Sequence, residues 1–230
     1  MARKVAKRSR ARAVELEWVK PAQQDRSRDT HARIIAAAER LLSRGRSWSE
    51  LSVAELVEEA DASVGAFYNR FRDKDALLHV LQLELLAQGA ATAARAAQLA
   101  DAALPLDALV RAFVTVAVAS YRDQRGLRRA LLVEMCTNPL FRERTIELSR
   151  VTCAGLAGVL APHVKGKDAD RLALVIDVAH RFVYGTLDQA LLYDDQAPTG
   201  RKITDPQLTD ELTLACLGYL ERSLPLRPEA

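Results

Sequence analysis

The chain has 230 residues, of which 49% are hydrophobic and 27% charged, and its 33 Lys and Arg against 30 Asp and Glu leave a formal net charge of +3. This balance is typical of a globular protein with one large or two modest domains, and it excludes a disordered polyelectrolyte. No apolar stretch reaches the roughly 18–20 residues of a membrane-spanning helix, and the charged N-terminus lacks the apolar segment of a secretory signal. We therefore expect a cytoplasmic protein without a membrane partner.

Residue types that perform catalysis or bind metals are not gathered into motifs. The three cysteines, Cys136, Cys153 and Cys216, lie far apart, and the four histidines are scattered. This spacing gives no zinc site and no disulfide framework. The chain also lacks the GxSxG, HExxH, Walker and GxGxxG motifs. We expect no catalytic residue, metal or cofactor, and an enzyme whose site assembles only in space stays open as an alternative.

Positive charge is concentrated near the N-terminus. Residues 1–75 hold 16 Lys and Arg against 12 Asp and Glu, and half of the first twelve residues are basic. Such a run is usually a solvated tail, but beside a nucleic-acid-binding module it can follow phosphates or enter a minor groove. We expect residues 1–25 to form a basic, disordered extension.

Helical spacing of apolar residues begins near residue 30 and continues to Gly45, a residue that commonly ends helices. A capping box at residues 52–55 opens a second helix that ends near Ala60, and a short third helix is predicted at residues 63–70. Six longer helices follow, at about residues 73–100, 106–121, 127–136, 138–160, 168–193 and 207–223. No segment alternates as a strand would. The sequence predicts an all-α fold in which a three-helix domain of residues 26–75 is joined to a helical bundle of residues 76–230.

The second and third helices have the pattern of a helix–turn–helix. Apolar side chains that can form its internal seam are Leu56, Ala60, Phe67 and Phe71. The opposite side of the short helix carries Val64, Gly65, Ala66, Tyr68 and Asn69. Small residues on that side would let the helix approach base edges in a major groove.

Three side chains near this helix suit DNA. Asn69 can pair with an adenine edge, and the Tyr68 hydroxyl suits a phosphate. Lys74, in the first turn of the next helix, combines a positive charge with free backbone amides, which also favours a phosphate.

Residues 28–78 carry the motif Leu41-Leu42 with Gly45, Ser52-Val53 with Leu56, Ala60 with Ser63, and Phe67-Tyr68 with Phe71, Lys74 and Leu77. This pattern resembles the tetracycline-repressor (TetR) family of bacterial transcription regulators. The resemblance implies an N-terminal DNA-binding domain, a C-terminal domain for effector binding and dimerisation, and repression relieved by a small molecule. It also implies that Ser52, Tyr68 and Lys74 contact phosphates and that Val64, Gly65, Ala66 and Asn69 face bases.

The sequence departs from the family pattern in two places. The connection at residues 46–51 is a residue or two longer than usual, and Asp61 stands in the turn where the family generally has glycine. Aspartate tolerates a left-handed backbone better than most residues, so the turn is expected to form. The charge of Asp61 near phosphates is expected to lower DNA affinity.

The helices at about residues 168–193 and 207–223 are apolar around much of their circumference. The resemblance implies that they form a two-fold, four-helix contact in a homodimer, as reading of a palindromic operator in double-stranded DNA requires. Burial within the chain's own core is the alternative.

An effector pocket in the bundle should be mostly apolar with a few polar groups. Side chains that can face the bundle interior are Phe113, Tyr121, Met135, Phe141, His180, Phe182 and Tyr184. Ordinary core packing is the alternative for each of them. Because aromatic residues are few and the bundle of residues 76–230, here the body, has little excess charge, we expect a neutral or weakly polar, largely apolar effector.

Together these patterns predict a sequence-specific, DNA-binding regulator, a repressor that a ligand releases. The helix that begins at Lys74 runs from the DNA-binding unit into the body, so a ligand that tilts it would change the separation of two recognition helices. An architectural DNA-binding protein without effector and a protein–protein adaptor are the alternatives.

Overall fold

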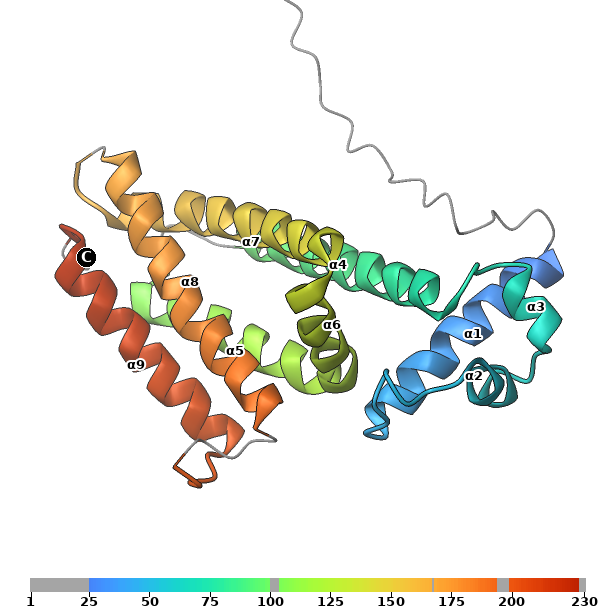
Figure 1. Ribbon diagram of the computed structural model, residues 1–230. Helices are drawn as coiled ribbons and strands as arrows, with labels where there is room; N and C mark the ends of the chain where they lie inside the picture. Colours follow the sequence, from blue (N-terminus) through green and yellow to red (C-terminus); the bar gives the residue numbers. More distant parts are fainter. Residues whose placement is uncertain (1–24, 100–103, 167, 194–198, 228–230) are drawn as a thin grey trace, which may run out of the picture.

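Helices dominate the computed structural model, which describes residues 25–99, 104–166, 168–193 and 199–227 (Figure 1). In chain order the helices are α1 (Asp25–Ser43), α2 (Val53–Glu59), α3 (Val64–Tyr68), α4 (Lys74–Leu99), α5 (Leu106–Asp123), α6 (Arg125–Thr137), α7 (Pro139–Leu160), the 3-10 turn η1 (Ala161–His163), α8 (Ala169–Leu192) and α9 (Asp205–Ser223). The all-α prediction is confirmed. The basic extension predicted for residues 1–25 lies outside the described residues, apart from Asp25 at the start of α1.

Local signals place the ends of the first helices where the sequence predicts them. Gly45 has a φ of +85°, and its N–H donates to the Leu42 carbonyl at 3.0 Å, which ends α1. At the start of α2, the Ser52 Oγ accepts from the Glu55 N–H at 3.2 Å, and the Ser52 N–H donates to Glu55 Oε2 at 2.9 Å. The predicted capping box is therefore present.

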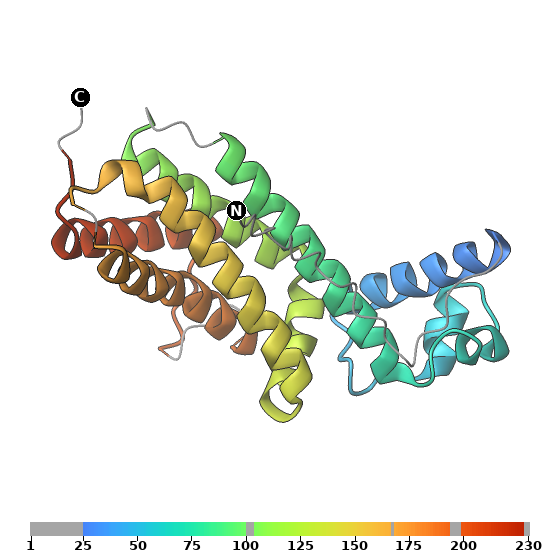
Figure 2. The ribbon, with the colours of Figure 1, turned by 90° about the horizontal axis from the view of Figure 1, so that it is seen from above.

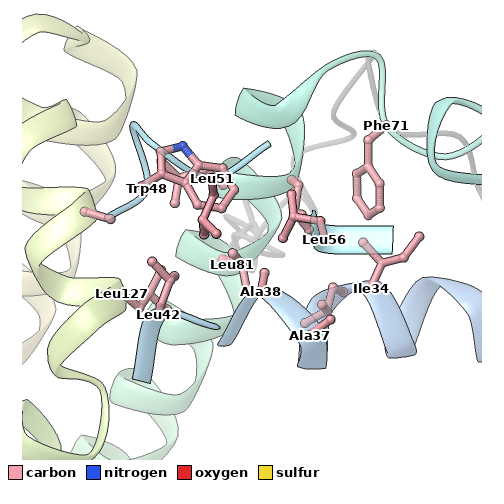
Figure 3. Packing of buried hydrophobic residues seen from close by; sticks show 14 of the residues in the cluster. Ile34, Ala37, Ala38, Leu42, Trp48, Leu51, Leu56, Phe71, Leu81 and Leu127 are labelled. Carbon is pink, nitrogen blue, oxygen red and sulfur yellow. The ribbon is translucent and has the colours of Figure 1, made fainter. Parts of the chain in front are cut away.

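One hydrophobic cluster, here the N-terminal core, joins α1–α4 to α6 and the start of α7. Figure 3 shows Leu42 of α1 beside Leu127 of α6, with Trp48 and Leu51 from the connection before α2 above them. Phe141 of α7 closes the cluster against α4. The domain boundary predicted at residue 75 remains a prediction, because this core continues across it.

A second cluster, here the C-terminal core, is built from α5, α7, α8 and α9. The residues after α9 close this end: the Lys165 N–H donates to the Pro225 carbonyl at 2.7 Å, and the Arg227 N–H donates to the His163 carbonyl at 2.8 Å. Helix α4 extends from the N-terminal unit along α7, so it connects the two parts of the molecule (Figure 2). None of the described helices is both long and apolar enough to cross a membrane.

Candidate nucleic-acid interface and interior cavity

Helix α3 is fixed from beneath by two aromatic side chains. Phe67 and Phe71 are fully buried, their ring centroids lie 5.3 Å apart, and Phe71 stacks on His31 of α1 at 5.1 Å. Ser63 begins the helix by accepting the Ala66 N–H at 3.1 Å. With Leu56 and Ala60 also buried, the predicted internal seam of the helix–turn–helix is confirmed.

The opposite side of α3 faces outward. Val64 is 47% exposed and Tyr68 52% exposed, Gly65 and Asn69 are also exposed, and Ala66 is half-buried. The five residues predicted to face DNA thus share one accessible surface, and each large apolar neighbour points inward. A short helix that is rigid below and open above has the form that major-groove reading requires.

The turn between α2 and α3 contains the left-handed residue that the sequence predicts. Asp61 has a φ of +48°, which aspartate tolerates better than most residues. Arg33 of α1 donates from Nη1 to the Asp61 carbonyl at 2.8 Å and to Asp61 Oδ2 at 3.4 Å. Sequence reasoning missed this clamp, because no local signal relates residues 28 positions apart. Arg33 also pairs with Asp29 at 3.3 Å, so its charge offsets only part of the Asp61 charge that was expected to lower DNA affinity.

A second ionic group holds α1 to the end of α2. Glu59 accepts from Arg40 Nε at 2.7 Å and from Arg44 Nη1 at 2.8 Å. These hydrogen bonds lower the pKa of the Glu59 carboxyl. Because the group is at the surface, it adds more to the alignment of the two helices than to stability.

Ser52 and Lys74, both predicted to contact phosphates, already have partners within the chain. The exposed Ser52 hydroxyl donates to Glu55 Oε2 at 2.9 Å as part of the capping box. Lys74 Nζ donates to the carbonyls of Trp48 at 2.7 Å and Leu51 at 2.8 Å, and it lies 5.2 Å from the centroid of the Trp48 ring. The lysine therefore fastens the connection at residues 46–51, which the sequence marked as unusually long.

A cavity of about 810 Å³ lies in the body, between α4, α6, α7 and α8 and the end of α5. Four of the predicted pocket residues line it: Tyr121, Met135, His180 and Tyr184. The rings of Tyr121 and Tyr184 lie 5.7 Å apart, and His180 packs on Tyr184 at 4.3 Å. The volume is within the range of small-molecule sites.

Three other aromatic residues proposed for the pocket lie elsewhere. Phe113 lines a separate, smaller pocket of about 50 Å³ beside α9. Phe141 is 1% exposed in the N-terminal core, where it stacks on His79 at 4.1 Å. Phe182 is 38% exposed and packs against Tyr219 of α9. Helical spacing alone did not distinguish the faces that line the cavity from the faces that pack in a core, because both faces of a bundle helix can be apolar.

Polar groups of the cavity wall were not anticipated from the sequence. The Tyr121 hydroxyl donates to Asp188 Oδ1 at 2.8 Å, and burial raises the pKa of both groups. The Arg128 guanidinium lies 4.2 Å from the centroid of the Tyr121 ring. Asp177 and Arg181, paired at 2.8 Å, also line the cavity. These groups are polar points in a wall that is otherwise mostly apolar, as expected for an effector pocket.

Apolar side chains remain exposed on α8 and α9, at the end of the molecule away from α1–α3 (Figure 1). Leu174 is 54% exposed and Leu192 53% exposed on α8, and Leu214 is 67% exposed on α9. The same helices bury Ile176 and Leu212 in the C-terminal core. Each helix thus has one apolar face inside the chain and apolar residues left outside it.

Comparison with known proteins identifies both parts of the chain. The family model "Bacterial regulatory proteins, tetR family" matches residues 34–81, and the model "Tetracyclin repressor-like, C-terminal domain" matches residues 105–220. A search of curated proteins gives no match.

Solved structures of low sequence identity share the fold. A TetR-family transcriptional regulator from Mesorhizobium loti is 17% identical, with a TM-score of 0.68 over 86% of this chain and 98% of that one. NalD, the secondary repressor of the MexAB-OprM multidrug efflux pump in Pseudomonas aeruginosa, is 19% identical, with a TM-score of 0.60 over 89% of this chain and 100% of that one. A tetR-family regulator from Streptomyces coelicolor is 20% identical, with a TM-score of 0.62 over 85% of this chain and 82% of that one. With a matching helix–turn–helix region and a matching C-terminal region in one all-α fold, the chain belongs to the TetR family and is a DNA-binding transcriptional regulator.

Proposed function

We propose that the protein is a dimeric repressor of the cytoplasm that binds a palindromic operator and leaves it when a small molecule occupies the cavity. The observation that carries this proposal is the surface of α3, on which exposed Val64, Gly65, Tyr68 and Asn69 stand over the buried Phe67 and Phe71. This is a rigid reading surface, and it is attached to a body with a cavity large enough for an effector.

The proposed DNA contacts divide into base and phosphate contacts. Val64, Gly65, Ala66 and Asn69 face base edges, with Asn69 as the hydrogen-bonding reader of adenine. Tyr68 and Ser52 contact phosphates through their hydroxyls. Lys74 contributes its charge and the free backbone amides of the first turn of α4 to a phosphate contact. Its Nζ also holds the connection at residues 46–51, which its hydrogen bonds to the Trp48 and Leu51 carbonyls support.

The proposed dimer forms through α8 and α9. A second copy would cover the apolar residues that these helices leave exposed, including Leu174, Leu192 and Leu214. A two-fold contact of this kind would present two α3 helices to half-sites about one helical turn apart.

Two elements reach from the cavity to the DNA-binding unit. Helix α4 contributes Gln82, Leu85 and Leu86 to the wall, and its first turn holds Lys74. Helix α6 contributes Arg128 and Met135, and its Gly126 is packed so closely on α1 that a Cβ there would lie 2.1 Å from the Leu42 carbonyl oxygen. A ligand that binds more tightly when α4 or α6 is in one position would favour the arrangement of the dimer with that position, and so change the separation of the two α3 helices. The size of this shift in equilibrium is set by the difference in the ligand's affinity for the two arrangements.

The test is a fluorescence-anisotropy titration of the full chain against DNA from upstream of its own coding region, near 150 mM salt, with scrambled DNA as control. We expect tight, sequence-dependent binding that saturates at two or four chains per site. Asn69→Ala should lower affinity by about tenfold and reduce the preference over scrambled DNA. The matched control is Asn138→Ala, which removes an asparagine that caps α7 in the body.

Equal, weak binding to both DNAs, with a strong salt dependence, would replace the proposal by an architectural DNA-binding function. Absence of binding even at low salt would remove DNA from the function of this surface.

A further inference from the structure

We infer that the cavity takes a ligand with a carboxylate on an apolar body, and that Arg128 of α6 binds the carboxylate. The inference rests on the proposed function, because that proposal makes the cavity the effector site. It replaces the expectation of a neutral effector, which was drawn from composition alone.

Arg128 is positioned at the cavity wall by its neighbours. Its guanidinium lies over the ring of Tyr121, 4.2 Å from the ring centroid, and its Nη2 donates to Ser120 Oγ at 2.9 Å and Gln124 Oε1 at 3.3 Å. Stacking on an aromatic face fixes the plane of a guanidinium. Because Nη2 uses both of its hydrogens on Ser120 and Gln124, Nη1 is the group that remains for a ligand. The side chain is therefore held in place before a ligand binds.

The positive charge of Arg128 has only uncharged hydrogen-bonding partners. Ser120 and Gln124 are neutral, and the buried Nε has no hydrogen-bond partner among the described residues. Of the other arginines of the wall, exposed Arg181 pairs with Asp177 and exposed Arg150 pairs with Glu147. Arg142 also has an uncharged partner, the Met135 carbonyl at 3.2 Å, but it is exposed, whereas Arg128 is half-buried. Because a half-buried cation gains most from an opposite charge, Arg128 is the place where an anionic group of a ligand is stabilised.

Asp188 is the carboxyl of the cavity wall that competes with a ligand carboxylate for Arg128. It accepts the Tyr121 hydroxyl at 2.8 Å, and burial raises its pKa above the ordinary value. The Tyr121 hydrogen bond and the nearby Arg128 guanidinium lower the same pKa, so Arg128 and Asp188 attract one another through their charges. No hydrogen bond joins Arg128 to Asp188 among the described residues, so the guanidinium has no carboxylate bound to it before a ligand enters.

The rest of the cavity suits the apolar part of such a ligand. Leu85, Leu131, Leu148 and Ala157 line it from three helices, and the whole volume is about 810 Å³. A guanidinium N–H forms a charge-assisted hydrogen bond with a carboxylate, and the neutral hydroxyl of the corresponding alcohol cannot supply the negative charge. Discrimination between an acid and its alcohol is therefore the signature of this site.

The experiment measures binding to the full chain by isothermal titration calorimetry at pH 7, in the absence of DNA. The probes are octanoate, decanoate, dodecanoate and 1-naphthaleneacetate, each compared with the corresponding primary alcohol. We expect at least one acid to bind about tenfold or more tightly than its alcohol. Arg128→Gln should abolish this preference, and Arg128→Lys should retain part of it because the charge remains.

Arg129→Gln is the matched control. It removes one positive charge from the neighbouring position of α6, where the side chain is exposed and does not line the cavity, so the preference should be unchanged. Failure of every acid to bind, equal binding of acid and alcohol, or a preference that survives in a folded Arg128→Gln variant would overturn the inference. Even if the Arg128→Gln variant does not fold, the comparison of each acid with its alcohol in the unaltered chain tests whether the cavity prefers a carboxylate.

The operator assay separates this result from the proposed function. Binding of an acid through Arg128 without release of operator DNA would keep the carboxylate site and remove ligand control from the proposed function. Release of operator DNA by an alcohol as effectively as by its acid would keep the proposed function and overturn the carboxylate inference.

Discussion

The N-terminal core and the body around the cavity use the same residue types in opposite ways. In the N-terminal core, Leu56, Phe67 and Phe71 are fully buried, and the nearby arginines Arg33 and Arg40 pair with carboxylates between helices. In the bundle of residues 76–230, the helices line a partly open cavity of about 810 Å³, and the hydrogen-bond partners of Arg128 are neutral. A surface that must keep one shape has a solid core beneath it, whereas a ligand site needs space and an unbalanced polar group.

The largest expected effect comes from one substitution made in both regions. Leu56→Ala should lower the free energy of unfolding by about 2–5 kcal/mol, because it opens a void in a fully packed core. Leu132→Ala removes the same atoms from the cavity wall and should lower it by about 1 kcal/mol, because that side chain already borders open space. Urea denaturation at one fixed chain concentration measures both, and equal losses would contradict the contrast between solid and hollow regions.

The contact between the two regions gives the next effect. Gly126→Ala places a Cβ 2.1 Å from the Leu42 carbonyl oxygen, so α6 or α1 must shift, and stability should fall by about 1–3 kcal/mol. In Gly158→Ala the added Cβ meets nothing within 4 Å, and stability should rise by up to about 1 kcal/mol. Thermal unfolding of the two variants tests the pair. A neutral Gly126→Ala with unchanged operator affinity would show that α1 and α6 are not closely coupled.

A smaller effect is expected at the connection that Lys74 fastens. Lys74→Met leaves the Trp48 and Leu51 carbonyls without their ammonium donor, which should lower stability by about 1–2 kcal/mol. The salt dependence of operator binding separates its two proposed roles. If Lys74→Met reduces the magnitude of the slope of log affinity against log salt concentration by about 1, the value for one phosphate contact, Lys74 contacts DNA directly. If the slope is unchanged, Lys74 only holds the connection at residues 46–51.

The smallest effect is on the pH dependence of stability. Burial, and then the nearby Arg144, lower the pKa of His79 below its ordinary value of 6.5. The folded chain therefore resists a proton that the unfolded chain accepts. The contribution of His79 to stability is complete above about pH 6.5 and is lost as the pH falls below that value. His79→Gln should reduce this loss by part only, because burial also lowers the pKa of His31 and His180. Denaturation midpoints between pH 5 and 8 measure the change, and an identical profile for the variant would contradict it.

Predictions that rested on local hydrogen bonds succeeded because their partners are close in sequence. The end of α1 and the start of α2 depend on Gly45 and on the Ser52–Glu55 pair, and the start of α7 depends on Asn138 in the same way. The capping box of Thr204 and Gln207 was not predicted, and α9 begins at Asp205 rather than at residue 207. Predictions about faces were less reliable. Of the aromatic residues proposed for the pocket, Tyr121 and Tyr184 line it, whereas Phe113 and Phe141 do not.

The sequence by itself determined the helices, their caps and the pattern of the helix–turn–helix, because these depend on periodicity and on hydrogen bonds within one turn. Only the tertiary structure decided that Arg33 clamps Asp61, that Lys74 holds the Trp48 carbonyl, and that Arg128 stands at a cavity wall beside Tyr121. A charged residue on a helix looks the same in the sequence whether it faces solvent, a carboxylate or a cavity. Its surroundings come from helices far away along the chain, and packing of the whole bundle determines them.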